Sequence, residues 1–353
     1  MNRIMKPRNL LFSALWFAGL AGAVAAPDGA GRDAMPYERW EVSEPVMTAG
    51  ASETFDDIAV KDPAIVYYKG RYHVFYTSKY TPESGARQTQ RNRQRSGLGY
   101  ASSPTLAGLS QAPRVNFSDL AGAQLIAPQV FYFAPQKLWY LVAQIPAKGE
   151  EPNLKPVYLT NPDIENVNGW SKVKVLPTKK ANNDFWIDFW VICDDRNAHL
   201  FYTDHRGSMF RMETPLAQFP DFTDSLDETV LTERGETEKG RWRMHEASHI
   251  YYVKSANKYL CLLEATYPHP TRRGYWDSRS RFMFAMVADK LEGPWERVEA
   301  SRNEFAGDPA RLFLANGARA KYDQVSHFEI IRPGCDQRFE IPDFNFVLFF
   351  QGF

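Results

Sequence analysis

The sequence has few cysteines and no net charge. Only three of its 353 residues are cysteines, at positions 193, 261 and 335. An odd number excludes a complete disulfide framework and the spacing matches no zinc site, although one bridge remains open. Lysine plus arginine and aspartate plus glutamate both number 42. This balance gives no electrostatic reason to expect a nucleic acid or an anionic membrane as a partner.

Long hydrophobic runs are also scarce, and the clearest one lies at the N-terminus. The run LLFSALWFAGLAGAVAA follows three basic residues and ends near an A-x-A site at residues 23–25. This pattern predicts a signal peptide over residues 1–25, followed by a linker over residues 26–45. We therefore expect a secreted or periplasmic protein that has no membrane association after cleavage. An uncleaved membrane anchor is the alternative.

Helical periodicity is rare beyond the N-terminus. What recurs instead is a pair of aromatic or β-branched runs joined by a short polar turn, which is typical of a β-hairpin. Such pairs cover residues 65–78, 129–144, 189–204, 249–265 and 326–352. Hairpins at a long, regular spacing predict an all-β fold, a five-bladed β-propeller over residues 46–353. An ordinary β-sandwich is the alternative.

Residues 245–249 read H-E-x-x-H, a pattern in which zinc proteases use both histidines as ligands. Strand-like runs follow, so we expect a strand or a loop here rather than a helix. In a strand, His245 and His249 would lie about 13 Å apart, at about 3.3 Å per residue. They could not share a zinc ion, whose nitrogen ligands lie about 2.1 Å away, and Glu246 would point away from both. The pattern therefore does not predict a zinc protease.

Three acids precede the first strand of different hairpins at corresponding positions. They are Asp62 in VKDPA, Asp188 in WIDFW and Glu246 in MHEAS. The innermost strands of a propeller line its axis, so we expect these carboxylates to converge despite their separation in sequence. Neighbouring like charges raise one another's pKa, and this cost points to acid–base chemistry. Taken singly, each acid could instead be a turn or loop residue.

Several motifs occur in order from about residue 55 to the C-terminus, among them VKDPAIVYYKGRYHVFYT, APQVFYFAPQKLWYLVAQ, WIDFWVICDDRNAHLFYTD, EASHIYYV and SHFEIIR. In these motifs the chain resembles glycoside hydrolase family 62, α-L-arabinofuranosidases whose five-bladed fold and three carboxylates are shared with family 43. The resemblance implies removal of terminal α-L-arabinofuranosyl side chains from a polysaccharide, arabinoxylan or arabinan, with inversion. We expect a monomer. A family 43-like arabinanase or β-xylosidase and a non-catalytic glycan-binding propeller are the alternatives.

The resemblance also assigns roles to the three acids. Asp62 falls on the general base, which activates water, and Glu246 falls on the general acid, which protonates the leaving oxygen. Asp188 falls on a third carboxylate, which orients the sugar and keeps the pKa of the acid high. An inverting glycosidase needs its base and acid about 6.5–9.5 Å apart, so that a water fits beside the sugar.

Four further residues are candidates for ligand contacts. By resemblance, Lys61 contacts the arabinose, and His327 aligns with a histidine that contacts a calcium ion. Calcium prefers oxygen ligands, so a single imidazole implies that waters complete the shell; a core histidine bonded to backbone is the alternative. Gln129 and Gln144 are expected to hydrogen-bond to sugar hydroxyls or to the waters of the ion. No organic cofactor is expected.

Three segments depart from the family pattern. Residues 77–100 are long and basic, which fits a solvated loop or a cleft wall that recognises an acidic glycan. The family's R-Y-F-R-S-like run reads RFMFA at residues 281–285, so the sugar-holding phenol is missing. Tyr275 and Trp276 could replace it by stacking on the sugar. Phe328 stands where a glycine is usual, and these changes put the identity of the sugar in doubt.

Overall fold

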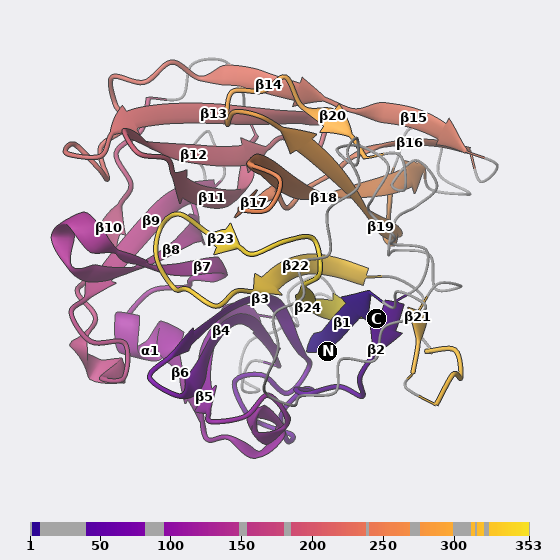
Figure 1. Ribbon diagram of the computed structural model, residues 1–353. Helices are drawn as coiled ribbons and strands as arrows, with labels where there is room; N and C mark the ends of the chain where they lie inside the picture. Colours follow the sequence, from indigo (N-terminus) through magenta and orange to yellow (C-terminus); the bar gives the residue numbers. More distant parts are fainter. Residues whose placement is uncertain are drawn as a thin grey trace, which may run out of the picture.

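The structure is a computed structural model that describes residues 2–7, 40–81, 95–147, 154–179, 185–237, 240–268, 276–298, 312–314, 316–320 and 325–352. These residues form five β-sheets placed around a common axis (Figure 1), which is the architecture of a β-propeller. In the described residues, helical structure is confined to short pieces, namely η2 (Ala107–Gln111), α1 (Phe117–Ala121), η3 (Ala134–Gln136) and η4 (Val167–Gly169). No helix in the described part of the chain is long and apolar enough to cross a membrane.

Each of the first three sheets contains four antiparallel strands. The first contains β3 (Ala59–Tyr68), β4 (Arg71–Tyr80), β5 (Arg95–Ser103) and β6 (Arg114–Asn116). The second contains β7 (Ile126–Phe133), β8 (Leu138–Pro146), β9 (Leu154–Asn161) and β10 (Lys174–Val175). The third contains β11 (Ile187–Cys193), β12 (Asn197–Thr203), β13 (Ser208–Pro215) and β14 (Glu228–Thr232). The first strand of each sheet lies nearest the axis (Figure 1).

The last two sheets are larger and less regular. The fourth contains β15 (Arg234–Thr237), β16 (Gly240–Met244), β18 (Lys258–Pro268), β17 (His249–Val253) and β23 (Glu340–Ile341), with β19 (Trp276–Ala288) and β20 (Glu296–Arg297) joined through β18. The fifth contains β21 (Leu312–Phe313), β2 (Trp40–Val42), β1 (Asn2–Pro7), β24 (Val347–Gly352) and β22 (Val325–Ile331). The fifth sheet therefore combines strands from both ends of the chain.

The five predicted hairpins are all present, as the antiparallel pairs β3–β4, β7–β8, β11–β12, β17–β18 and β22–β24. The turn of the first pair shows why its sequence folds locally. Lys69 and Gly70 have φ angles of 46° and 79°. A two-residue turn with both residues in the left-handed region matches the twist of the flanking strands.

The folded part begins earlier than expected from the sequence. Trp40–Val42 forms β2 and Trp40 is fully buried, so the last residues of the expected linker, 26–45, belong to the fifth sheet. The sequence did not predict this strand, because it has only three residues and follows a Gly/Ala/Pro-rich segment. Asn2–Pro7, within the expected signal peptide, forms β1 between β2 and β24, and residues 8–39 lie outside the described residues. Cleavage of the signal peptide stays a prediction.

The start of each inner strand has the same backbone feature. One residue there lies in the left-handed region, with φ of 45° at Asp62, 50° at Ala127, 57° at Asp188, 61° at Ala247 and 43° at His327. The pairing register shifts at four of these five places, as in a β-bulge. Non-glycine residues in such conformations cost about 1–3 kcal/mol each, so the surrounding structure must hold them.

Side chains from the second strand of one sheet hold the bend in the next sheet. They accept hydrogen bonds from the backbone amides of the left-handed residues. The contacts are Gln351 Oε1 with the amide of Asp62 at 3.0 Å, Thr77 Oγ1 with that of Ala127 at 2.8 Å, Gln144 Oε1 with that of Asp188 at 3.1 Å, and Glu264 Oε1 with that of His327. We call Thr77, Gln144, Thr203, Glu264 and Gln351 the inter-sheet ring.

Thr203 holds the fifth place in this ring. It pairs with Ile187 in the third sheet as Thr77 pairs with Lys61 in the first. Its Oγ1 is buried and has no hydrogen-bond partner in the structure. The ring therefore contains two threonines in the same position, only one of which makes the inter-sheet contact.

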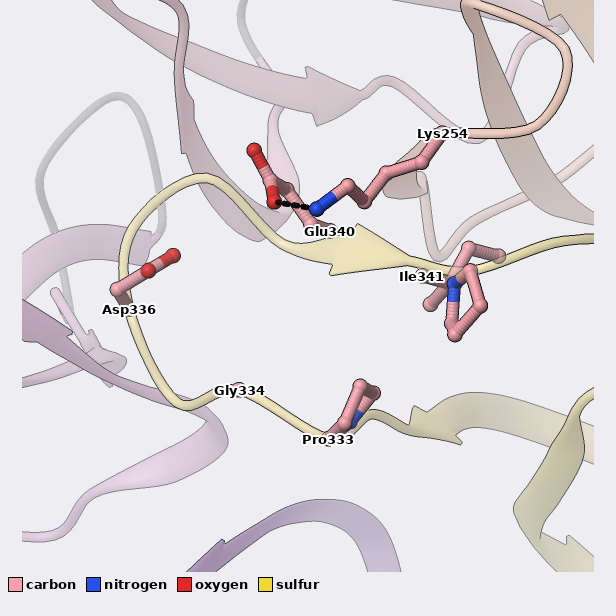
Figure 2. Close-up of a pocket in the computed structure, with 7 residues that line it drawn as sticks. Lys254, Pro333, Gly334, Asp336, Glu340 and Ile341 are labelled. Atoms are coloured by element: carbon pink, nitrogen blue, oxygen red, sulfur yellow. Dashed lines mark ion pairs between the residues drawn. The ribbon is translucent and has the colours of Figure 1, made fainter.

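A second element closes the opposite end of the axis. Residues 332–342, which we call the strap, cross the ends of three inner strands. The amides of Tyr132, Cys193 and Tyr252 donate to strap carbonyls at distances of 2.8, 2.8 and 3.1 Å. A cavity of about 360 Å³ lies beside the strap, where Lys254 pairs with Glu340 (Figure 2). This cavity is at the end of the inner strands opposite to the three candidate acids.

Replacing Thr77 with valine tests the contribution of the ring. The change removes the acceptor for the Ala127 amide and keeps the side-chain shape, so the free energy of unfolding should fall by about 1–3 kcal/mol. Thr203→Val is the matched control and should be neutral or stabilising, because the Thr203 hydroxyl has no partner. Urea unfolding measures both changes. Equal losses in the two variants would mean that the inter-sheet contact adds no stability.

Candidate active site

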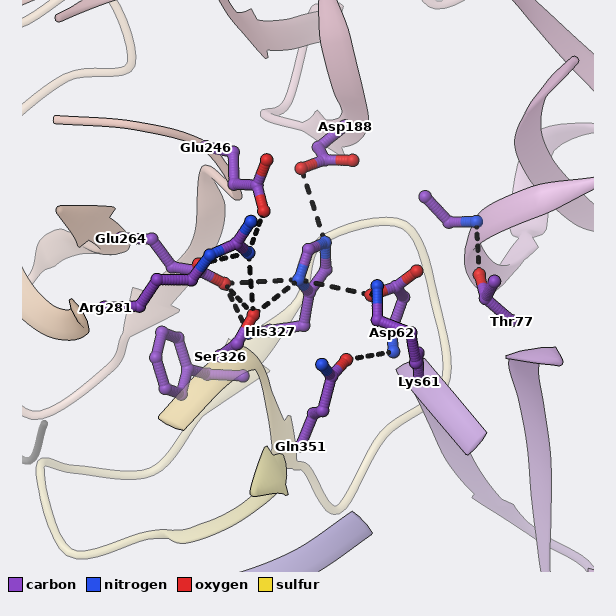
Figure 3. A network of polar contacts seen from close by, with 12 residues as sticks. Lys61, Asp62, Thr77, Asp188, Glu246, Glu264, Arg281, Ser326, His327 and Gln351 are labelled. Carbon is purple, nitrogen blue, oxygen red and sulfur yellow. Dashed lines mark hydrogen bonds and ion pairs between the residues drawn. The ribbon is translucent and has the colours of Figure 1, made fainter. Parts of the chain in front are cut away.

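Two of the predicted acids face opposite sides of one imidazole (Figure 3). His327 Nδ1 lies 3.4 Å from Asp62 Oδ1, and His327 Nε2 lies 3.3 Å from Asp188 Oδ2. All three side chains are buried. Each is the left-handed residue of its inner strand, so the same backbone bend directs all three toward the axis.

Glu246 adjoins this group from the fourth sheet. A carboxylate oxygen of Asp188, a carboxylate oxygen of Glu246 and a ring nitrogen of His327 all lie within 4.8 Å of one another. Glu246 Oε1 pairs with Arg281 Nη1, which also lies 3.0 Å from Glu264 Oε2. Glu264 Oε1 is 3.2 Å from His327 Nδ1. The structure thus brings together the three acids expected from the sequence and connects them through residues that were not expected.

The backbone position of Glu246 differs from that of the other two acids. In the fourth sheet the left-handed residue is Ala247. The Glu264 amide donates to the Glu246 carbonyl at 3.0 Å, so Glu246 holds the place that Lys61 and Ile187 hold in their sheets. The sequence alignment of the five hairpins placed Glu246 at the position of Asp62 and Asp188, but in the structure Ala247 holds that position. The sequence does not show which non-glycine residue adopts positive φ.

The bend at Ala247 also changes the interpretation of H-E-x-x-H. His245 Nε2 lies 3.6 Å from Glu246 Oε2, so His245 is beside the acid and not on the opposite face, as a continuous strand would place it. His249 is at the first position of β17, contacts the Phe328 carbonyl, and stacks on Trp190 with ring centroids 4.4 Å apart. The expected strand or loop is confirmed, and His249 is a core residue.

Two cations flank Asp62. Burial alone would raise the pKa of Asp62, but Lys61 and His327 lower it below its usual value. Lys61 Nζ lies 3.4 Å from Asp62 Oδ1. Burial would lower the pKa of His327, but Asp62, Asp188 and Glu264 raise it well above its usual value. Asp62 is therefore ionised, next to an ammonium and an imidazolium.

Asp188 and Glu246 have opposite electrostatic environments. Burial raises the pKa of Asp188, and the charges of Glu246 and Asp62 add to that rise against the opposing effect of His327. Burial would also raise the pKa of Glu246, but Arg281 and His245 bring it well below its usual value. The expectation that Asp188 keeps the pKa of Glu246 high does not hold for this state, since the Arg281 guanidinium lies closer.

Sequence reasoning missed three residues that contact this group. Glu264 was detectable, as a lone acid in the apolar run KYLCLLEA. Arg281 precedes the phenylalanine that replaces the expected tyrosine, but no local pattern shows that β19 directs it toward Glu246. His205 lies just after β12, with Nε2 at 2.6 Å from Glu246 Oε2. Its role follows only from the packing of the third sheet against the fourth.

The other predicted sugar contacts have different outcomes. Gln129 exchanges two hydrogen bonds with the backbone of Val191, at 2.7 and 2.8 Å. Gln144 bonds to the amide of Asp188 and lies 3.4 Å from its carboxylate. Both amides therefore join neighbouring sheets, and sugar binding by them stays a prediction. Tyr275 lies outside the described residues, and Trp276 is described only as the first residue of β19.

The atoms around His327 suit calcium in part. Asp62 Oδ1 and Asp188 Oδ2 are buried and have no hydrogen-bond partner in the structure. Carboxylate oxygens of this kind are the ligands that calcium prefers. The resemblance implied that His327 contacts the ion directly, with waters completing the shell, but an imidazolium has no free lone pair, so in this state His327 would act on such an ion only through water molecules. Calcium binding stays a prediction.

Comparisons with known proteins agree with this geometry. The family model "Glycosyl hydrolase family 62" matches residues 47–353. Alpha-L-arabinofuranosidase C from Cellvibrio japonicus (strain Ueda107) is 30% identical over 296 residues, which cover 84% of this chain and 41% of that protein. The chain thus spans less than half the length of this curated relative.

Solved structures show the same similarity. The catalytic domain of a Coprinopsis cinerea GH62 alpha-L-arabinofuranosidase is 28% identical with a TM-score of 0.68, covering 89% of this chain and 96% of that one. A GH62 hydrolase in complex with xylotriose is 25% identical with a TM-score of 0.67, covering 89% and 97%. The β-propeller predicted from the hairpins is confirmed.

Replacing Arg281 with glutamine tests the ion pair with Glu246. The change removes the guanidinium that two buried carboxylates, Glu246 and Glu264, share, so the free energy of unfolding at pH 7 should fall by about 3–5 kcal/mol. The folded-state pKa of Glu246 is depressed, so the pair stabilises the fold above the unfolded pKa, and this stability is lost as the pH falls through the folded pKa. The deficit of the variant should therefore shrink on acidification.

Urea unfolding from pH 7 down to about pH 2 measures this deficit, because the change is expected below the ordinary glutamate pKa of about 4.3. Arg297→Gln is the matched control, because Arg297 lies in the same sheet and pairs with Glu233. That partly exposed pair should contribute about 0–1 kcal/mol. A deficit for Arg281→Gln that stays constant across the pH range would contradict the assignment.

Proposed function

The chain belongs to glycosyl hydrolase family 62, and on that premise we propose that it hydrolyses α-L-arabinofuranosyl side chains of a xylan-type polysaccharide. The observation that carries this proposal is the meeting of Asp188, Glu246 and His327 within 4.8 Å, with Asp62 on the other side of the imidazole. The names of two similar proteins, both alpha-L-arabinofuranosidases, support arabinofuranose as the sugar that is released. The complex of a similar hydrolase with xylotriose supports a xylan backbone as the polymer that carries the side chains.

Asp62 is suited to act as the general base. It is ionised because Lys61 and His327 lower its pKa. It would take one proton from a water molecule while the water oxygen forms a bond to the anomeric carbon. Lys61 lies beside this carboxylate and would also contact the sugar. His327 bridges Asp62 and Asp188, so it fixes the base relative to the third acid.

Glu246 would supply the proton that the leaving oxygen takes as the glycosidic bond breaks. In the structure it is held ionised by Arg281 and the two neighbouring histidines. A proton must therefore reach Glu246 before bond cleavage. Binding of the sugar can raise the pKa of Glu246 by drawing Arg281 away. His205 Nε2, at 2.6 Å from Oε2, is placed to deliver the proton.

Inversion is proposed from the positions of these two groups. Asp62 contacts Lys61 and His327, whereas Glu246 contacts Arg281 and His205. The two groups are connected through contacts from Arg281 to Glu264, from Glu264 to His327 and from His327 to Asp62. This leaves the base and the acid on separate sides of the group, as an inverting enzyme needs for its water. NMR of the first product from arabinoxylan tests this, because inversion releases β-arabinofuranose.

Three further properties are proposed. A calcium ion near Asp62 and Asp188 would hold these carboxylates ionised, and elemental analysis of the purified protein tests for it. Export is proposed from the N-terminal pattern, and it suits an enzyme whose substrate is a polymer. A monomer is proposed and is tested by light scattering.

Two substitutions separate the base from the acid. Glu246→Gln should lower kcat on arabinoxylan by about 10²–10⁴-fold, and so should Asp62→Asn. On a dinitrophenyl arabinofuranoside the Glu246→Gln variant should be much less impaired, because that leaving group needs no proton. Asp62→Asn should be equally impaired on both substrates, since water must still be activated.

Steady-state kinetics on the two substrates measure this contrast. The same loss on both substrates for Glu246→Gln would contradict its role as the acid. Sugar binding without turnover by the unsubstituted protein would instead establish a glycan-binding propeller. Release from arabinan or β-xylosides alone would favour the family 43-like alternatives.

A further inference from the structure

A second group of potential metal ligands surrounds the other oxygen of Glu246. Atoms of His205, His245 and Glu246 lie within 4.8 Å of one another. His205 Nε2 is 2.6 Å and His245 Nε2 is 3.6 Å from Glu246 Oε2. Arg281 occupies Oε1, so Oε2 is the oxygen that faces the two imidazoles. Two imidazole nitrogens and one carboxylate oxygen are a common ligand set for catalytic-type zinc sites.

The distances are close to those that zinc requires. Zinc binds nitrogen and oxygen at about 2.0–2.2 Å, so neighbouring ligand atoms of a tetrahedral site lie about 3.3 Å apart. The two observed separations, 2.6 and 3.6 Å, bracket this value. The imidazole rings are stacked, with centroids 4.2 Å apart, so they must turn toward each other to share an ion. His205 lies in the bend after β12 and its side chain is 28% exposed, which gives room for that rotation.

The charge and access of the site also favour a divalent cation. Among the described residues, four buried carboxylates, Asp62, Asp188, Glu246 and Glu264, face three cationic groups, namely Lys61, Arg281 and the His327 imidazolium. The exposed edge of His205 gives an ion a path from solvent. Nitrogen ligands favour zinc or copper over calcium, so this group differs in chemistry from the oxygen atoms around His327.

We propose that His205, His245 and Glu246 bind a zinc ion that reversibly inhibits the enzyme. The site uses the first two residues of H-E-x-x-H with a histidine from a different sheet, and it does not use His249. Three protein ligands leave a fourth position for water. Zinc on Oε2 prevents Glu246 from carrying a proton there, so the metal-bound form lacks the acid. Zinc binding itself is independent of the proposed sugar specificity.

Calorimetric titration of Zn²⁺ into chelator-treated protein, without substrate, tests the site. We expect one equivalent to bind. His205→Gln and His245→Gln should each raise the Kd for zinc by at least about tenfold. Even a change in a residue that only hydrogen-bonds to a metal ligand lowers metal affinity by about this factor. Arg206→Lys is the matched control, since Arg206 is an exposed neighbour of His205 and keeps its charge. It should bind zinc like the unsubstituted protein.

A second readout uses Co²⁺ as a visible-light probe of the same site. The unsubstituted protein should show the absorption of a four-coordinate cobalt ion, and both histidine variants should lose it. His245 is buried, so circular dichroism must show that its variant is folded. The partly exposed His205 provides the test if that variant is not folded.

Inhibition links the site to the reaction. Zn²⁺ should inhibit arabinose release from arabinoxylan, whose leaving group needs a proton, in the unsubstituted protein and in Arg206→Lys, and EDTA should restore the rate. His205→Gln should need at least about tenfold more zinc. An unchanged Kd in His205→Gln, or no zinc binding by the unsubstituted protein, overturns the proposal. One zinc bound at these residues in a protein without arabinofuranosidase activity would instead leave the site standing and refute the proposed function.

Discussion

The fold depends on one repeated hydrogen bond, from the amide of a left-handed residue to a side chain of the preceding sheet. The left-handed conformation is unfavourable for Asp62, Ala127, Asp188 and His327, and a buried amide without a partner adds to that cost. At each of these four bends the acceptor belongs to the neighbouring sheet. The bends are therefore stable only when the sheets have closed around the axis, so the positions of the acids depend on closure of the whole propeller.

The bend explains how much of the site could be predicted from the sequence. Asp62 and Asp188 were found because they precede hairpins with clear strand patterns at corresponding positions, and in the structure both have the left-handed conformation. Glu246 was found through its motif, but its register was wrong because Ala247 takes the bend. Residue letters report hydrophobic periodicity, and they do not report which non-glycine residue adopts positive φ.

Arg281 and His205 could not have been predicted for a different reason. Each reaches Glu246 from a segment that is distant in sequence. Arg281 lies among ordinary strand residues, and His205 lies in a short connection between two strands. Their contact with the acid depends on the angle between strands and between sheets. Such angles follow from packing and are absent from local patterns. Glu264 is an intermediate case. The sequence shows a single acid in an apolar strand, but it does not show that Arg281 is its partner.

The electrostatics of the group oppose the acid role that is proposed for Glu246. Asp62 is ionised, as a base must be, while the cations around Glu246 lower its pKa and remove the proton that an acid must carry. The same surplus of buried carboxylates requires these cations, because unpaired charges inside a protein are costly. Arg281 thus stabilises the fold and opposes catalysis through the same contact. Substrate binding must weaken the contact between Arg281 and Glu246. The proposed metal ion would bind Glu246 Oε2, the oxygen that Arg281 does not contact.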